Sequence, residues 1–129
     1  MTVPFYCVLV ALVLAYLPSF AVATSLVLQH RLDNHAPRRQ AATLTGWHLR
    51  CKSAHYNGLE ALTGFAAGVF VAHLAGADST LSAQLAVAFV VARLAYIACY
   101  LADLSTLRST VWTAGFTITL GFFLLPLVK

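Results

Sequence analysis

The side chains that could do chemistry fall into three short blocks of a very apolar chain. The first block contains His55, Asn57 and Glu60, the second contains Arg93, Tyr96 and Tyr100, and the third contains Arg108 and Ser109. Guanidinium, amide, phenol and hydroxyl groups supply hydrogen-bond donors, and several of them together would bind a polar ligand that carries a carboxylate. A charge inside an apolar segment costs about 2.5–3.5 kcal/mol on insertion scales, so such residues usually face a bundle interior or a wet cavity. The blocks therefore mark a candidate binding site.

The spacing within the first two blocks places their residues on shared helix faces. Asn57 and Glu60 are three residues apart, and Arg93, Tyr96 and Tyr100 form one stripe of a helix. Two interpretations stay open for these residues. In the first they form a structural network, in which Glu60 pairs with Arg93 and the tyrosines hydrogen-bond at the membrane interface. In the second they line an anion-binding pocket.

Arg108 favours the second interpretation. The sequence places this residue, with Ser109, in the first turn of the last helix, where a basic side chain opposes the helix dipole. A bound anion would explain a cation at that position, because helix N-termini attract negative charge. Arg31, at the end of the first helix, is predicted to lie at the same membrane face as Arg108.

Composition identifies the kind of protein that must position these residues. The chain has 129 residues, of which 60% are hydrophobic and 9% charged, against about 25% charged in a typical soluble domain. These values exclude a soluble globular domain, a disordered chain and a collagen-like chain, and they predict an all-α integral membrane protein. The cysteines and histidines show no metal-ligand or disulfide spacing, so no metal is expected.

Four apolar segments are predicted to span the membrane as one helical bundle. The single domain covers residues 1–129, with spans at about 3–28, 57–75, 81–101 and 110–128. A polar, basic link joins the first two spans and ends in a helical return from about Thr45. Ser79 or Ser82 is expected to cap the third span. Gly64 and Gly68 form a GxxxG motif that allows close helix packing within the bundle or an oligomer.

The basic residues indicate how the bundle is oriented. The net charge is +4, but five of the eight Lys and Arg residues lie between Arg31 and Lys52, in the first link. We interpret them as a topology signal and not as a nucleic-acid-binding patch. Together with Arg108 in the third link, they place the first and third links in the cytoplasm. Both termini are then expected on the non-cytoplasmic side.

The three blocks in order resemble the MAPEG family, the membrane-associated proteins in eicosanoid and glutathione metabolism. The resemblance rests on residues 53–61, 92–103 and 106–109, extends over nearly the whole chain, and is nearest to uncharacterised bacterial members. It implies a homotrimer of four-helix subunits in a bacterial inner membrane. It also implies that glutathione binds between subunits near the cytoplasmic face as a cosubstrate, without a metal.

The resemblance also assigns expected roles to individual residues. Arg31 matches a basic position at the end of the first helix, and Asn57 and Glu60 match ligand-contacting positions with His55 beside them. Tyr100 matches a tyrosine of the glutathione pocket, with Tyr96 nearby. Arg108 matches the arginine that stabilises the thiolate, with Ser109 next to it. Two positions depart from the prostaglandin synthase branch. Tyr56 replaces an arginine that contacts glutathione, and Trp112 replaces a tyrosine.

The leading functional prediction is a glutathione-dependent transferase or peroxidase that acts on a lipophilic electrophile arriving from the lipid. Arg108 would stabilise the thiolate, because a nearby positive charge and a helix N-terminus both favour the anion. The alternative is a non-catalytic membrane trimer that binds a lipid or has a structural role, with the same polar residues joining its helices. A transporter is disfavoured, since the chain has no inverted repeat or broken helix pair.

Overall fold

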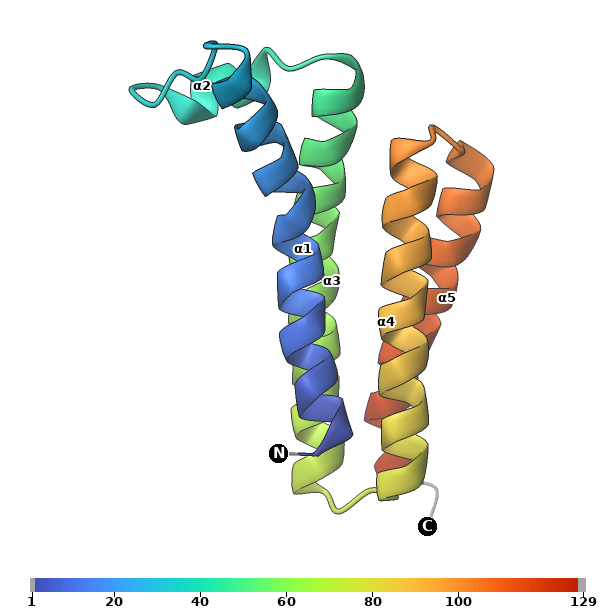
Figure 1. The fold of residues 1–129 in the computed structure, drawn as a ribbon. Helices are drawn as coiled ribbons and strands as arrows, with labels where there is room; N and C mark the ends of the chain where they lie inside the picture. The colour runs from blue at the N-terminus through green and yellow to red at the C-terminus, as the bar shows by residue number, and fades with distance from the viewer. Residues whose placement is uncertain (1, 128–129) are drawn as a thin grey trace.

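The computed structural model of the protein describes residues 2–127 and is a bundle of long helices (Figure 1). In chain order, the elements are α1 (Val3–Leu28), α2 (Pro37–Ala42), α3 (Gly46–Leu74), α4 (Ser79–Leu101), α5 (Ser105–Leu124) and the 3-10 helix η1 (Leu125–Leu127). No β-strand occurs within residues 2–127. The helix α1 packs against α3 and α4, and α5 packs against α3 and α4, so α1 and α5 lie at opposite corners of the bundle. The short helix α2 projects sideways at the end where α1 finishes (Figure 1).

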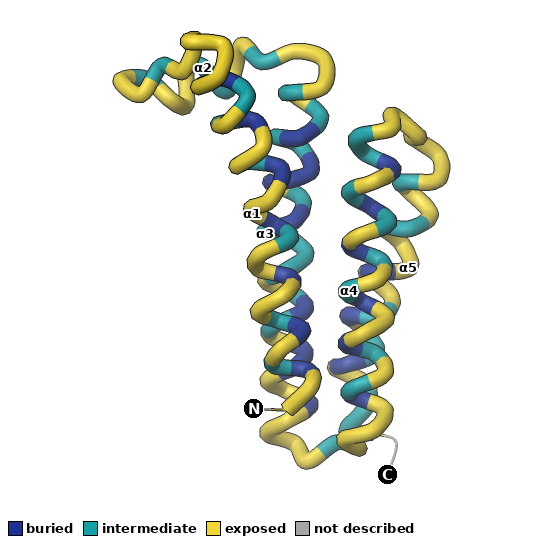
Figure 2. The backbone as a smooth tube through the Cα atoms, in the orientation of Figure 1, coloured by how far each residue is buried: buried dark blue, intermediate teal, exposed yellow. Residues whose placement is uncertain are grey.

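Three of the long helices are long and apolar enough to cross a membrane. They are α1, α4 and the continuous segment Ser105–Leu127, which joins α5 to η1. The outer faces of these helices expose large apolar side chains, such as Phe20 on α1 and Val91 on α4, while buried residues face inward (Figure 2). An apolar outer face is stable in lipid and not in water, so the protein is an integral membrane protein.

Two helices begin at positions that differ from the sequence-based prediction. The helix α5 starts at Ser105 and not near residue 110, because Asp103 adopts a left-handed conformation with φ of 61° and completes the turn after α4 early. The helix α4 is capped by Asp78, whose Oδ1 accepts a hydrogen bond from the Leu81 N–H at 2.7 Å. The expectation that Ser79 or Ser82 caps this helix is therefore wrong.

The first link also contains more regular structure than its polar composition indicated. Pro37 begins the short helix α2, where its fixed φ and missing N–H are tolerated. Thr45 directly precedes α3, at the predicted helical return. The helix α3 therefore extends well beyond its apolar part and carries His55, Asn57 and Glu60 on regular helix.

Three fully buried phenylalanines join α3, α4 and α5. The rings of Phe65 and Phe89 stack with centroids 3.9 Å apart and planes 10° apart. The ring of Phe122 meets Phe65 edge-on, with centroids 5.6 Å apart. Tight van der Waals packing of this kind holds membrane helices together, since lipid tails provide no hydrophobic driving force between them. The three rings fix how α3 and α4 are aligned along their axes.

Glycines allow α3 to approach both α1 and α5 closely. A Cβ atom on Gly58 would lie 2.9 Å from the Ala15 Cα atom of α1, and one on Gly68 would lie 2.9 Å from the Phe122 Cβ atom of α5. Gly64 faces Thr119 of α5 at a slightly longer distance. The GxxxG motif therefore packs α3 against α5 within one chain, which is the first of the two contacts expected for it.

Candidate functional site

Asn57 links the buried Arg93 to Glu60 at the interface of α3 and α4. Arg93 is only 5% exposed, and its Nη2 donates a hydrogen bond to Asn57 Oδ1 at 3.1 Å. Asn57 Nδ2 in turn donates to Glu60 Oε2 at 3.4 Å. The predicted direct pairing of Glu60 with Arg93 is wrong, because neither ion pair found within residues 2–127 joins them and the side chain of Glu60 is exposed. The amide lies between the two charges and contacts both.

A line of stacked cations and aromatic rings continues from Arg93 toward α5. The Cζ atom of Arg93 lies 4.2 Å from the centroid of the Tyr96 ring, and the rings of Tyr96 and Tyr100 meet edge-on at 5.5 Å. The Cζ atom of Arg108 lies 4.4 Å from the centroid of the Tyr100 ring. A cation that lies over an aromatic face at this distance is attracted to the ring. We call the connected set the polar series: Glu60, Asn57, Arg93, Tyr96, Tyr100 and Arg108.

Arg108 ends the polar series in the first turn of α5. Its backbone N–H donates to the Leu104 carbonyl at 2.9 Å, and Leu104, the N-cap residue, provides no side-chain cap. The first N–H groups of α5 therefore receive no side-chain acceptor from the N-cap residue. The half-buried guanidinium of Arg108 belongs to the same helix turn. Both features favour an anion at this helix end. Ser109 is exposed beside it, and its hydroxyl donates to the Ser105 carbonyl at 3.1 Å.

A cavity of about 200 Å³ opens beside the polar series, between α3, α4 and α5. Part of its lining is polar and includes Asn57, Glu60 and Arg93, which the hydrogen bonds of Asn57 link to one another. The other walls include Trp112 and Phe116, whose rings lie parallel within 4° and 5.4 Å apart. A ligand with a polar end and an apolar body matches this division. From the sequence, Trp112 was identified only as a departure from the prostaglandin synthase branch, and Phe116 was not identified, because its position resembles that of an ordinary lipid-facing side chain.

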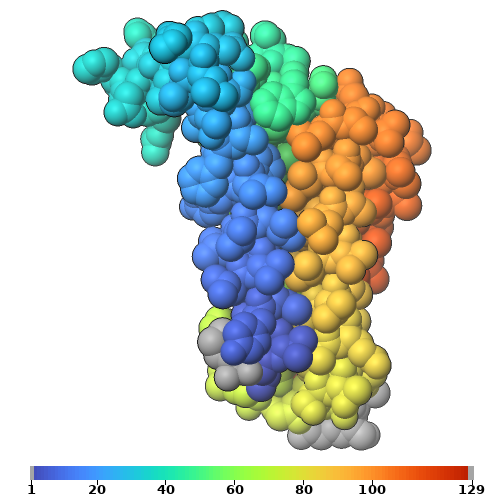
Figure 3. All heavy atoms as spheres, viewed as in Figure 1, coloured from blue at the N-terminus to red at the C-terminus, as the bar shows by residue number. Residues whose placement is uncertain are grey.

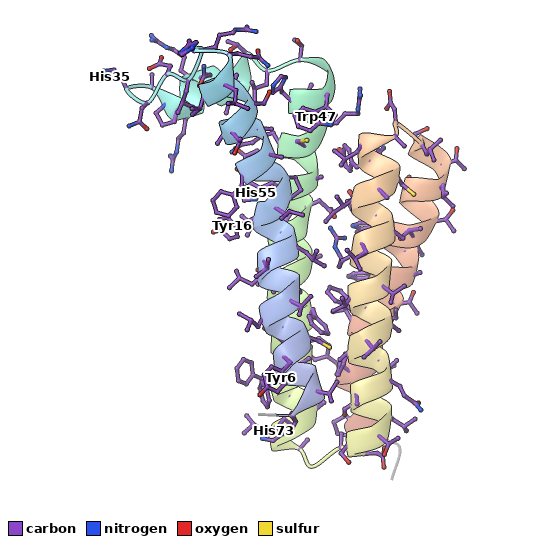
Figure 4. All side chains as sticks on the ribbon, viewed as in Figure 1. Tyr6, Tyr16, His35, Trp47, His55 and His73 are labelled. Atoms are coloured by element: carbon purple, nitrogen blue, oxygen red, sulfur yellow. The ribbon has the colours of Figure 1, made fainter. Side chains whose placement is uncertain are left out.

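His55 and Arg31 lie apart from the polar series. His55 is buried against α1, where its Nδ1 donates to the Ala15 carbonyl at 2.8 Å beside the ring of Tyr16 (Figure 4). Arg31 is exposed just beyond the end of α1, and its Nη1 donates to Gln29 Oε1 at 3.3 Å. One chain therefore brings together most of the predicted site residues but leaves these two on the α1 side of α3.

The cysteines and the other residue types that bind metals do not form a metal site within residues 2–127. The three cysteines, Cys7, Cys51 and Cys99, are buried and free on separate helices. Within residues 2–127, no three His, Cys, Asp or Glu side chains lie close enough together to hold a metal ion.

Comparison with known proteins places the chain in a family. A search of curated proteins gives no match. The sequence model of the MAPEG family matches residues 3–128, which is essentially the whole chain. This family is associated with glutathione and eicosanoid metabolism in membranes and includes glutathione transferases and peroxidases. The chain, an all-helical integral membrane protein, belongs to the MAPEG family.

Proposed function

We propose that the protein is a glutathione-dependent transferase or peroxidase that acts on a lipophilic electrophile. One observation carries the proposal: the polar series ends on a cation at the start of α5 and runs beside a cavity lined by both polar side chains and aromatic rings. Glutathione has charged ends and a central thiol, and its acceptor would enter from lipid. Membership of a glutathione-associated family supports the same assignment.

The proposed chemistry needs the thiolate and not the thiol. Arg108 and the first N–H groups of α5 favour the anion, which lowers the pKa of the bound thiol. In the transferase reaction the thiolate attacks an electrophilic carbon, a carbon–sulfur bond forms, and the leaving group departs with its electron pair. In the peroxidase reaction the thiolate attacks a peroxide oxygen and the O–O bond breaks. The released alkoxide takes up a proton, and a second glutathione attacks the sulfenic acid so formed, giving a disulfide while the oxygen leaves as water.

The charges of the polar series suit the two ends of glutathione. Glu60, which is exposed, would accept hydrogen bonds from the ligand's ammonium group. Among residues 2–127, Arg93 makes one side-chain hydrogen bond, to Asn57, so its other donors can serve a carboxylate in the cavity it lines.

We propose a homotrimer with each site between two subunits. This arrangement accounts for Arg31 and His55, which lie on the α1 side of α3, away from the polar series. In a ring, the α1 side of one subunit would meet the α4–α5 side of the next, and these residues would then complete the neighbour's site. The exposed Ser109 would also face that neighbour.

We also propose that α3 is the fourth span, in a bacterial inner membrane with both termini outside the cytoplasm. Its length and its packing against α1, α4 and α5 support a span, although it carries more polar residues than they do. The start of α1 and the end of α5 lie at one end of the bundle, and the basic first link lies at the other (Figure 1). That distribution fits the positive-inside rule.

Purified protein tests the function directly. Glutathione with a chlorodinitrobenzene should give the aryl thioether, or with a lipid hydroperoxide the alcohol, and Arg108→Ala should lose most of either activity while Arg108→Lys retains part. Reduced glutathione should raise the melting temperature in detergent more than its disulfide does. Absence of thiol-dependent turnover with both classes of electrophile would reject the enzyme assignment.

The second candidate, a non-catalytic trimer, is favoured by a different observation. The guanidinium groups of Arg93 and Arg108 already stack on tyrosines, so the polar series is partly satisfied within the chain. On this account its role is to join helices. Arg108→Ala would then lower the melting temperature without any thiol-dependent activity to lose.

A further inference from the structure

A separate groove lies beneath α2, on the α1 side of the bundle. Its volume is about 130 Å³, and Ser19 and Ala23 of α1 form part of its floor. Pro37 and Ala41 of α2 face it from above, and Lys52 of α3 lines its edge. Figure 3 shows the first link and α2 overhanging α1 at this end of the molecule. We call this cavity the α2 groove.

Side-chain hydrogen bonds hold the overhang in one shape. Gln40 Nε2 donates to the Arg31 carbonyl at 2.6 Å, and Gln40 Oε1 accepts from the Asp33 N–H at 3.0 Å. Asp33 Oδ1 accepts from the His35 N–H at 2.9 Å. Leu44, just after α2, packs against the buried cluster between α1 and α3. The α2 groove is therefore a formed feature of the fold.

The groove lies where the protein concentrates its positive charge. Five of the eight basic residues fall between Arg31 and Lys52, with Asp33 as the single acid there, whereas basic and acidic residues elsewhere balance each other. The whole net charge of +4 therefore resides in this segment. Asp33 is already engaged with the backbone and lies 3.8 Å from Arg39. Lys52 is the basic residue that lines the groove, and no carboxylate is among its lining residues, so the groove itself offers a cation to an incoming head group.

We propose that the α2 groove binds one anionic phospholipid. Lys52 would meet the phosphate, while the acyl chains would lie against the apolar floor of the groove, which includes Val22 and Ala23 of α1. The groove has a membrane-spanning helix as its floor and the basic link above it, so it lies at the boundary between acyl chains and head groups. Basic pockets between helices at this level recognise anionic head groups. The proposal concerns the α1 side of the bundle and does not rest on thiol chemistry.

The test compares two lipids on the full-length protein in neutral detergent. Phosphatidylglycerol should raise the melting temperature more than phosphatidylcholine with the same chains, and it should be retained as a bound adduct in native mass spectrometry. Lys52→Gln should lower the phosphatidylglycerol affinity about fivefold, because each basic residue near an anionic surface contributes attraction of that order. Lys52→Arg, which keeps the charge, should retain the preference.

A second pair of variants tests the apolar part of the groove. Ala23→Leu would fill the floor and should reduce retention of both lipids, whereas Ala88→Leu makes the same change at an exposed position of α4 and should not. Equal effects of the two lipids, or an unchanged preference in Lys52→Gln, would overturn the proposal. So would equal protection by glycerol phosphate alone, which would indicate a soluble phosphate site. Loss of the oligomer in Ala23→Leu without any lipid dependence would assign the groove to a subunit contact instead.

Discussion

Replacing Asn57 by alanine removes the one side-chain hydrogen bond that residues 2–127 offer to the buried guanidinium of Arg93. A hydrogen bond to a charged group contributes about 1.5–3 kcal/mol. The Tyr96 ring remains in place and the cavity beside Arg93 can admit water, so the loss should stay within that range. We therefore expect the free energy of unfolding to fall by about 1.5–3 kcal/mol.

Two matched variants separate this account from a direct ion pair. Asn57→Asp keeps an oxygen acceptor for Arg93 and should cost less than Asn57→Ala. Glu60→Gln should cost at most about 1 kcal/mol, because Glu60 is exposed and does not contact Arg93 directly. If Glu60 instead neutralised a dry Arg93, the same change would strand a buried charge and cost about 3 kcal/mol or more.

The assay is thermal or denaturant unfolding in detergent, followed by helical circular dichroism, for all three variants against the parent protein. The expected order of destabilisation is Asn57→Ala, then Asn57→Asp, then Glu60→Gln. A larger loss in Glu60→Gln than in Asn57→Ala would refute the bridging role of the amide and restore the direct pair.

Three further outcomes follow from the packing, topology and assembly. Gly58→Ala should destabilise the protein by about 1–3 kcal/mol, because the new Cβ atom would lie 2.9 Å from an α1 Cα atom. Gly121→Ala, whose Cβ atom would have its nearest contact at 3.5 Å, should be tolerated, and equal melting temperatures of the two variants would contradict the close approach of α1 and α3. In a background without the native cysteines, an impermeant maleimide added outside the cell should label Ala75→Cys and miss His35→Cys, and the reverse pattern would invert the topology. Native mass spectrometry in detergent should show three subunits, and a monomer that still binds glutathione would remove the intersubunit site.

Helical spacing accounts for the parts of the site that the sequence predicted. Arg93, Tyr96 and Tyr100 recur at intervals of three and four, so any α-helix places them on one stripe, and along α4 the guanidinium does lie over the Tyr96 ring, which meets the Tyr100 ring edge-on. The proximity of Arg108 to Tyr100 follows from the short turn between α4 and α5. These relations are local and need no knowledge of the tertiary packing.

Relations that depend on packing between helices were not predictable in the same way. Asn57 and Glu60 share a face of α3, but which of them reaches Arg93 depends on the axial alignment of α3 and α4, set by Phe65 and Phe89.

His55 lies two residues before Asn57, which turns it to nearly the opposite side of the helix. It shares the α1 face with Gly58, three residues on, so its separation from the polar series was present in the spacing.

The α2 groove had no local signal either. The helix α2 is six residues long, and its position depends on Gln40 bonding to backbone groups of the link. A polar, basic segment with a proline is typical of an irregular loop. Only the folded structure, in which these hydrogen bonds fix the link and Leu44 packs against the cluster between α1 and α3, shows that this segment covers a groove.

The most direct test of the proposed function is the ionisation of bound glutathione in the parent protein, Arg108→Ala and Arg108→Lys. Ultraviolet thiolate absorbance would be recorded as glutathione is added at neutral pH, with turnover measured in parallel. Removing the cation should raise the pKa of the bound thiol toward its ordinary value of ~8.5, and a rise of about two units would reduce the thiolate up to a hundredfold. Turnover of Arg108→Ala should therefore recover as the pH rises, while Arg108→Lys stays closer to the parent. An unchanged thiolate signal and unchanged turnover in Arg108→Ala would contradict the catalytic role of Arg108 and favour the structural role of the polar series.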